Sequence, residues 1–311
     1  MKLGFYTEYN KETVEFAHKV GFRSMELSAW PESTLNAETT TDQKIREVKK
    51  DLDAHDIEIS ALGYYPNYLD PEKEKAEEAT EYFYKVMKLA QRMDVPVVCT
   101  FAGRDMYKSV KANIPLFEKA FNPFCDEAEK LGLKIAIENC PMLDRVTQLS
   151  ENIAFSPEVW DEMYKVVPSK ALGIELDPAH MVWQGIDYVQ AIHDYGERIF
   201  HIHAKDMQID RKILGRVGIL GQTFADIIGL GHGWWKARIP GFGEIDWHAF
   251  ISALVEVGYR GNVDIEHEDD VFALAHMKMV ESEAGIVEAY GREEKGLILG
   301  YNTLSKIIPP E

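Results

Sequence analysis

Four short runs of apolar residues in this sequence end at side chains that can bind a metal ion. In an extended strand alternate side chains share a face, so the apolar residues of each run would pack on one side while its polar residues face the other. A carboxylate at a buried strand end is costly unless it is paired or coordinated. Four such side chains on separate strands therefore predict one shared metal site. The runs are residues 135–138, 174–177, 199–206 and 263–266, and the predicted ligands are Glu138, Asp177, His203 and Glu266.

Three carboxylates and one imidazole form a harder set of donors than the thiolate or histidine-rich sets of structural zinc sites. No Lys or Arg is expected among the three acids, so we expect one divalent metal ion to balance their charge. Mn²⁺ is preferred, with Mg²⁺, Co²⁺ or Zn²⁺ as alternatives. Such an ion can hold a carbonyl and a neighbouring hydroxyl and stabilise an enediolate. Glu138 and Glu266 would then be the catalytic pair that removes and returns the proton.

Short apolar runs alternate with longer amphipathic segments eight times along the chain. This alternation indicates parallel strands joined by crossover helices, and eight units predict a single closed (β/α)8 TIM barrel, an α/β fold. An open doubly wound sheet is disfavoured because no glycine-rich phosphate-binding turn follows the first strand. A barrel places chemistry at the C-terminal ends of its strands. The expected strands are residues 2–7, 23–28, 58–65, 95–101, 133–140, 172–178, 199–206 and 262–268.

The strand at residues 199–206 carries an unusual row of polar side chains. His201, His203 and Lys205 share one face, which would point into the barrel, whereas Phe200 would pack against the helices. His201 lies deeper than His203, so we expect it to form hydrogen bonds in the interior rather than to bind the metal. Its candidate partners are Glu175 and Asp264.

The connection at residues 207–245 is far longer than the loops of most compact domains. It is rich in glycine, contains two adjacent tryptophans and follows a strand C-terminus, so it would lie over the barrel mouth as a lid. A subunit interface is the alternative. We expect residues 1–290 to form the barrel with this insertion, and residues 291–311 to form an extension that packs on the barrel or on a partner subunit.

Composition excludes several classes of protein. The 311 residues carry a net charge of −18, which repels a phosphate backbone and argues against nucleic acid and anionic membrane as partners. No apolar run is long enough to span a membrane, and the first residues read as a strand rather than a signal peptide, so a cytoplasmic protein is expected. The three cysteines have neither metal-site nor disulfide-framework spacing.

Five motifs of this sequence resemble those of a known family. Together they are similar to the xylose isomerase-like TIM barrels, and within them to the sugar phosphate isomerase/epimerase group that includes the ketose 3-epimerases. The resemblance covers essentially the whole chain, and it is specific for the fold and metal site but much less so for reaction and substrate. The motifs are Glu138-Asn-Cys-Pro, Asp177-Pro-Ala-His180, His201-Ile-His203-Ala-Lys-Asp206, Pro240-Gly-Phe-Gly243-Glu-Ile-Asp246-Trp247 and Asp264-Ile-Glu266-His-Glu-Asp269.

This resemblance implies that the four predicted ligands hold the metal, that the two glutamates act as acid and base, and that His180 contacts substrate oxygens. Two positions depart from the ketose 3-epimerases, which carry an Arg shortly after the His-x-His strand and a further Glu shortly after the Glu138 position. Ile209 and Asp144 stand near those places, although Arg211 or Arg238 could replace the Arg. The departures weaken the expectation of 3-epimerisation of a free ketose.

Further residues are expected to line the barrel mouth and contact a substrate, because they follow strands or lie in the long connection. Aromatic side chains at such positions commonly stack on sugar faces. Including the two histidines beside the predicted ligands, the candidate substrate-binding residues are His180, His201, Trp30, Tyr65, Arg104, Trp235 and Arg238.

The leading hypothesis is a metal-dependent isomerase or epimerase of a monosaccharide, sugar phosphate or polyol ketone, working through an enediolate. The second is a lyase on the same site that eliminates a β-substituent from a keto sugar, as in inosose dehydratase-like or C-glycoside-cleaving relatives. An endonuclease IV-like phosphodiesterase and a non-catalytic sugar-binding protein are less favoured. The expected partner is a small carbohydrate; we expect a homo-oligomer, or a hetero-subunit if the protein cleaves C-glycosides.

Overall fold

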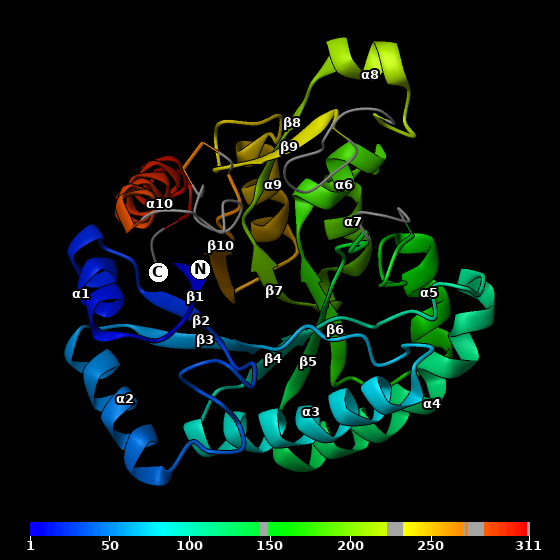
Figure 1. Cartoon of the computed structure of the whole chain (residues 1–311), viewed down its shortest axis with the longest axis horizontal. Coiled ribbons are helices and arrows are strands. Elements are labelled where there is room, and N and C mark those ends of the chain that lie inside the picture. The colour runs from blue at the N-terminus through cyan, green and yellow to red at the C-terminus, as the bar shows by residue number, and fades with distance from the viewer. Residues whose placement is uncertain (144–148, 223–232, 270, 273–282, 310–311) are drawn as a thin grey trace.

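The computed structural model describes the chain except for residues 144–148, 223–232, 270, 273–282 and 310–311, and for residues 283–292 it describes the backbone alone (Figure 1). Eight parallel strands close into a barrel in the order β1-β2-β3-β4-β5-β6-β7-β10. The predicted TIM barrel is therefore confirmed. Its strands are β1 (Lys2–Thr7), β2 (Ser24–Ser28), β3 (Glu58–Gly63), β4 (Val97–Thr100), β5 (Lys134–Glu138), β6 (Leu172–Leu176), β7 (Ile199–His203) and β10 (Asn262–Ile265).

Helices surround the barrel and cover its apolar outer face (Figure 1). Their ends follow local signals: at the first helix Asn10 caps the N-terminus by accepting from Thr13 N at 2.8 Å, and Gly21 ends it with φ of 112°. The helices are α1 (Lys11–Val20), α2 (Asp42–Ala54), α3 (Lys73–Met93), α4 (Val110–Leu131), α5 (Pro157–Val166), α6 (Pro178–Gln184), α7 (Tyr188–Tyr195), α8 (Arg211–Val217), α9 (Trp247–Glu256) and α10 (Glu283–Leu304).

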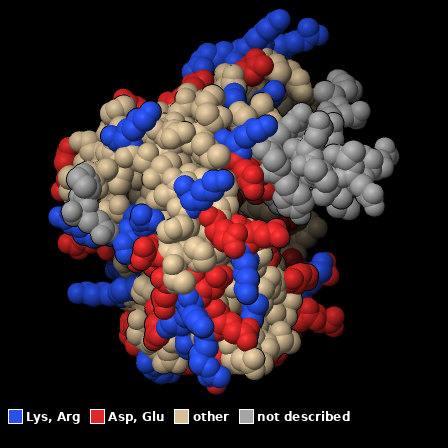
Figure 2. All heavy atoms as spheres, turned by 90° about the vertical axis from the view of Figure 1, so that its left-hand side faces the viewer, with Lys and Arg blue, Asp and Glu red and all other residues tan. Residues whose placement is uncertain are grey.

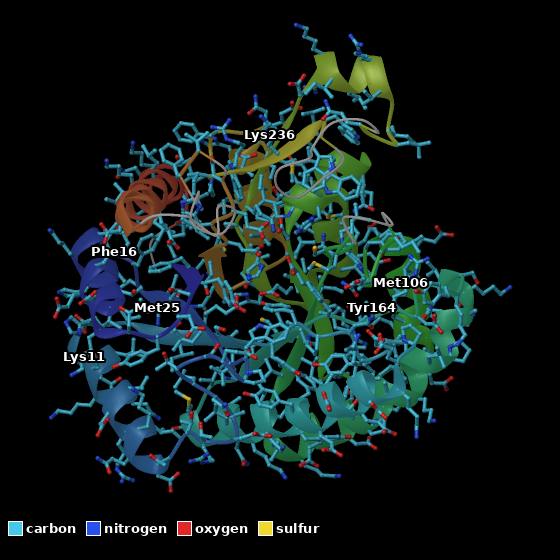
Figure 3. The ribbon with its side chains drawn as sticks, viewed as in Figure 1. Lys11, Phe16, Met25, Met106, Tyr164 and Lys236 are labelled. Carbon is cyan, nitrogen blue, oxygen red and sulfur yellow. The ribbon has the colours of Figure 1, made fainter. Side chains whose placement is uncertain are left out.

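The main hydrophobic core fills the layer between strands and helices. Met25 on β2 is buried there, and Phe16 on α1 packs against the same core (Figure 3). Phe200 is an exception to the predicted pattern, because it packs with Val97 and Ala136 in a separate small cluster instead of against the helices. The strand register shifts between Ile174 and Glu175 where β6 meets β7, so strict alternation does not carry across this pair.

The long connection after β7 builds an antiparallel hairpin from β8 (Asp206–Ile209) and β9 (Trp235–Arg238), with α8 projecting beyond it (Figure 1). The buried Asp206 carboxylate accepts hydrogen bonds from Gly241 N at 2.9 Å, Ile245 N at 3.1 Å and Trp247 Nε1 at 3.0 Å. A Cβ on Gly243 would lie 2.2 Å from Asp206 Oδ1, so only glycine fits there. The motif at 240–247 therefore folds around Asp206.

The C-terminal residues pack on the barrel through α10. Leu304 is fully buried, and the Tyr301 ring lies 4.9 Å from that of Phe22. Most of residues 291–311, which were predicted to form an extension, belong to α10, and residues 273–282 before this helix lie outside the described residues.

The described residues allow two statements about the surface and the helices. In the described part of the chain, no helix is both long and apolar enough to cross a membrane. On the face shown in Figure 2, Lys and Arg side chains are spread among Asp and Glu side chains.

Candidate metal centre and active site

The predicted carboxylate ligands converge at the C-terminal mouth of the barrel. Glu138 ends β5, and Asp177 follows β6 as the N-cap of α6, where it accepts from Ala179 N at 2.8 Å. Asn139 holds Asp177 by accepting from its backbone N–H at 2.7 Å. Glu138, Asp177, Glu266 and His180 each offer one donor atom within 4.8 Å of the others. The structure therefore brings three of the four predicted ligands together.

The fourth predicted ligand, His203, lies directly beside this group. Its Nδ1 is 3.4 Å from Glu138 Oε1 and 3.3 Å from Glu266 Oε2, so one ring edge faces both glutamates. The ring is 1% exposed. His180 is grouped with all three carboxylates, whereas His203 approaches two of them, Glu138 and Glu266.

His180 carries the observation that best fits a bound ligand. Both of its ring nitrogens are buried without a hydrogen-bond partner among the described residues, while Nε2 lies 3.4 Å from Asp177 Oδ2. Burial, and then the nearby Lys205 charge, holds the pKa of His180 well below its usual range, so the imidazole is neutral. A neutral buried imidazole whose N–H and lone pair both lack a partner is costly unless a metal or a substrate hydroxyl approaches it. The donor atoms present fit one divalent cation.

Lys205 is a site residue that the sequence argument missed. Its Nζ contacts Glu266 Oε2 at 2.5 Å, Glu268 Oε2 at 3.0 Å and Asp177 Oδ2 at 3.1 Å, and the side chain is only 2% exposed. The expectation that no Lys or Arg stands among the acids is therefore wrong. The spacing of Lys205 predicted that it shares the inward face with His201 and His203, but its contacts with the acids were not predicted.

The two candidate catalytic glutamates lie in different electrostatic environments. Burial, and then the neighbouring Glu266 charge, raises the pKa of Glu138. Burial also disfavours the charge on Glu266, but Lys205 and His203 outweigh it and hold the pKa of Glu266 below its usual value. Burial raises the pKa of Asp177 to about 8. One carboxyl that favours the proton thus faces one that favours the charge, an arrangement suited to acid and base roles.

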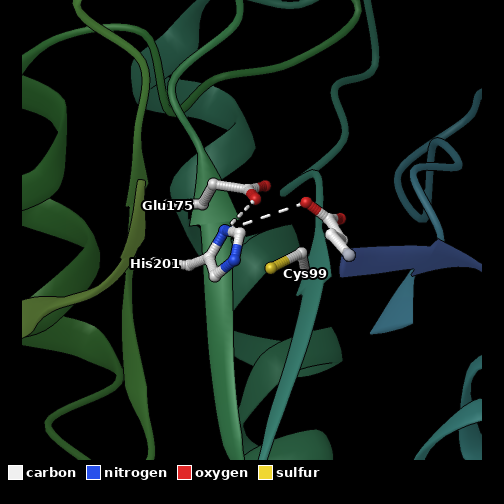
Figure 4. A group of neighbouring side chains, drawn as sticks. Cys99, Glu175 and His201 are labelled. Carbon is white, nitrogen blue, oxygen red and sulfur yellow. Dashed lines mark hydrogen bonds and ion pairs between the residues drawn. The ribbon is translucent and has the colours of Figure 1, made fainter. Parts of the chain in front are cut away.

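Below this mouth the barrel interior holds a second layer of buried polar side chains. The His201 ring contacts Glu175 Oε1 through Nδ1 at 2.8 Å (Figure 4). Its Nε2 contacts Asp264 Oδ2 at 3.0 Å, so the two predicted partners of His201 are confirmed. The Tyr65 hydroxyl donates to Glu26 Oε1 at 2.5 Å and also lies 2.9 Å from Glu175 Oε2. This layer supports His203 from beneath.

Most of the other predicted substrate-binding residues make contacts within the protein. Trp30 packs edge-on against Tyr64 at 4.8 Å, and Arg238 pairs with the buried Asp269 at 2.8 Å. Arg104 has a buried Nε without a hydrogen-bond partner among the described residues. Their predicted contacts with substrate stay predictions. Asp144, which stands near the epimerase Glu position, lies outside the described residues.

Trp235 links the long connection to the candidate site. Its ring stacks on Trp183 with centroids 5.1 Å apart and an interplanar angle of 11°. Trp183 lies on α6, one turn after His180. The neighbouring Lys236 is exposed on β9 (Figure 3). The stacked tryptophans therefore join the hairpin to the helix that carries His180.

Comparison with known families decides the membership of this chain. The family model described as xylose isomerase-like TIM barrel matches residues 14–290. The chain belongs to this family. It is 25% identical to the uncharacterised protein YfiH of Bacillus subtilis, over 86% of this chain and 93% of that protein.

Two further proteins that are similar to this chain carry names that state an activity. An inosose dehydratase of Clostridium tetani is 23% identical, over 84% of this chain and 88% of that protein. The structure of a D-psicose 3-epimerase from Clostridium cellulolyticum H10 superposes with a TM-score of 0.69 at 18% identity, covering 100% of both chains. At this identity the structural likeness supports the shared fold.

Proposed function

We propose that this protein is a divalent-metal-dependent isomerase or epimerase of a monosaccharide or related keto sugar, which moves a proton at the carbon beside a carbonyl. The observation that carries the proposal is that Glu138 and Glu266 both lie close to His203 Nδ1, at 3.4 Å and 3.3 Å. Two carboxylates close to one proposed metal ligand could exchange protons with the two faces of a flat enediolate bound to the metal. The named activities of the epimerase and dehydratase relatives support a carbohydrate substrate.

Glu138, Asp177, His203 and Glu266 would hold the ion, with Mn²⁺ as our first choice because three of the four donors are carboxylates. When bound, the ion would polarise the substrate carbonyl and stabilise negative charge on its oxygen. We assign His203 rather than His180 as the imidazole ligand because its Nδ1 lies close to both candidate catalytic glutamates. His180, with two unpartnered nitrogens, is left to contact substrate hydroxyls.

The protein side chains would divide the remaining work. One glutamate removes the proton from the carbon and the other returns one, which positioned carboxylates do with typical accelerations of about 10²–10⁴-fold. Lys205 supplies a buried ammonium that can hold a substrate oxygen as it gains negative charge. The Trp183–Trp235 stack offers an apolar wall beside His180.

The test is a panel of ketoses and keto polyols incubated with the Mn²⁺-loaded protein, with products identified by NMR. Turnover of at least one compound, its loss on treatment with a chelator and its return on adding Mn²⁺ are expected. The absence of any product across the panel from a protein that has bound Mn²⁺ would contradict the proposal.

A lyase is the second candidate function, and Lys205 is the observation that favours it. Its ammonium lies beside both Glu266 and Glu268, so a cation that could stabilise the departing oxygen stands close to a candidate base. Elimination needs a base at the carbon and a proton for the leaving hydroxyl or phenol. An inosose and a 3-keto glycoside added to the same panel separate the two reactions, because elimination releases water or an aglycone whereas isomerisation conserves the formula.

A further inference from the structure

The His203 ring joins the two layers of polar side chains in the barrel. Its Nδ1 edge faces Glu138 and Glu266 at the mouth, and its Nε2 edge faces the interior. On that inner side Glu26 Oε2 lies 2.7 Å from Nε2. The ring can present a lone pair at Nδ1 only if its hydrogen is on Nε2. The residue that accepts this hydrogen therefore decides which nitrogen is offered to the mouth.

Glu26 is held in place for this contact. It lies on β2, is fully buried, and its second oxygen, Oε1, accepts from the Tyr65 hydroxyl at 2.5 Å. Glu175 Oε1 also comes within 3.0 Å of His203 Nε2, but Glu175 already binds His201 at 2.8 Å through the same oxygen. The distance from His203 Nε2 to Glu26 is therefore shorter than that to Glu175, and the Glu26 oxygen does not also bind His201 at hydrogen-bond distance.

We propose that Glu26 is a positioning residue of the metal centre, which accepts the His203 Nε2 hydrogen and so fixes the tautomer that presents Nδ1 to the metal. This inference rests on the metal centre of the proposed function but not on the reaction catalysed there. Carboxylate partners of ligating histidines orient the ring and raise its basicity, and their loss typically weakens metal binding about 10–100-fold.

A purely structural role for Glu26 is the competing explanation, and Asp264 supplies a matched control. Asp264 is an equally buried acid of the same interior layer, but its carboxylate contacts Ser24, Ser60 and His201 rather than His203. Glu26→Gln and Asp264→Asn each remove one negative charge without changing the shape of the side chain. A difference between them therefore reports the contact with His203 and not the charge alone.

The experiment measures the affinity of the full-length protein for Mn²⁺ by competition with a chelator. Glu26→Gln should weaken binding about 10–100-fold, and Asp264→Asn by much less. In the Zn²⁺-loaded wild type, ¹⁵N NMR should show His203 with its hydrogen on Nε2 and its metal on Nδ1. If Glu26→Gln does not fold, Tyr65→Phe serves instead, because it removes the hydroxyl that holds Glu26, and a smaller weakening is expected.

Three results would overturn the inference: equal affinities of Glu26→Gln and wild type, equal losses in Glu26→Gln and Asp264→Asn, or a His203 hydrogen on Nδ1 in the Zn²⁺ form. For Tyr65→Phe, unchanged affinity would have the same meaning. A wild type that binds no divalent metal would instead remove the proposed metal centre itself, so the two failures are distinguishable.

Discussion

Among single residues, Lys205 adds to the candidate site a positive charge that was not predicted there. A buried ammonium touches two of the predicted ligands, so the carboxylates are arranged around both a metal position and a fixed cation. Since an ammonium repels a divalent ion, Lys205 cannot assist metal binding directly. Three ion pairs with acids stabilise its buried charge, and we propose that this charge holds a substrate oxygen that becomes negatively charged.

Lys205→Met should therefore lower turnover about 100-fold or more, as loss of a donor at a developing negative charge does. Mn²⁺ affinity should stay the same or rise, because the competing ammonium is gone. Steady-state turnover and chelator competition measure the two effects separately. Lys236→Met, on the exposed side of β9, is the control and should change neither quantity. Full turnover in Lys205→Met would exclude this role.

Among the elements, β7 and β8 connect the candidate site to the hairpin, because β8 follows β7 almost directly in the chain. His203 is the last residue of β7 and Asp206 is the first of β8. The proposed metal ligand His203 is therefore three residues away from Asp206, around which the 240–247 motif folds. Because Asp206 satisfies two backbone N–H groups and the Trp247 indole, the connection is attached to the barrel close to the metal ligands.

Asp206→Asn should destabilise the protein by about 2–4 kcal/mol, since a buried anion with several hydrogen bonds is replaced by an amide that can accept fewer of them. The free energy of unfolding in urea measures this change. Asp210→Asn is the matched control, because Asp210 caps α8 and Asn is an equally good N-cap. Equal stabilities of the two variants would show that the turn does not depend on Asp206.

The alternation of polar and apolar residues was enough to predict the barrel and the convergence of Glu138, Asp177 and Glu266, because parallel strands bring their C-terminal ends to one edge. It placed Lys205 on the inward face, but it could not reveal that the Lys205 ammonium pairs with the acids or that Glu26 on β2 contacts His203. Those contacts join residues distant in sequence and depend on rotamers. The β8–β9 pairing was missed because its strands lie on opposite sides of a long insertion.

At the scale of the whole molecule, the protein is one barrel in which polar residues occupy the axis and the apolar core lies outside the strands. Two of the three cysteines, Cys99 and Cys125, are buried in this framework. Cys125 on α4 is 1% exposed. Expectations about oligomeric state and about the long connection as a lid or an interface stay predictions.

Burial raises the pKa of the Cys125 thiol to about 12, whereas a thiol in an unfolded chain has a pKa of about 8.5. Ionisation therefore favours the unfolded chain, and the free energy of unfolding should fall as pH rises from about 8.5 toward 12, with no contribution from this group below that window. Urea unfolding at about pH 7.5 and pH 10 should show a smaller fall in Cys125→Ala than in the wild type. Identical falls would show that the thiol does not couple to folding.

We propose that Glu138 and Glu266 move a proton at a carbon beside a carbonyl. Incubation of the Mn²⁺-loaded protein with the keto sugar panel in deuterated water tests it most directly. The wild type should incorporate deuterium at that carbon in at least one substrate, and Glu138→Gln should lose exchange at least about 100-fold while it still binds Mn²⁺. No exchange by the metal-loaded wild type, or undiminished exchange by Glu138→Gln with metal bound, would contradict the claim.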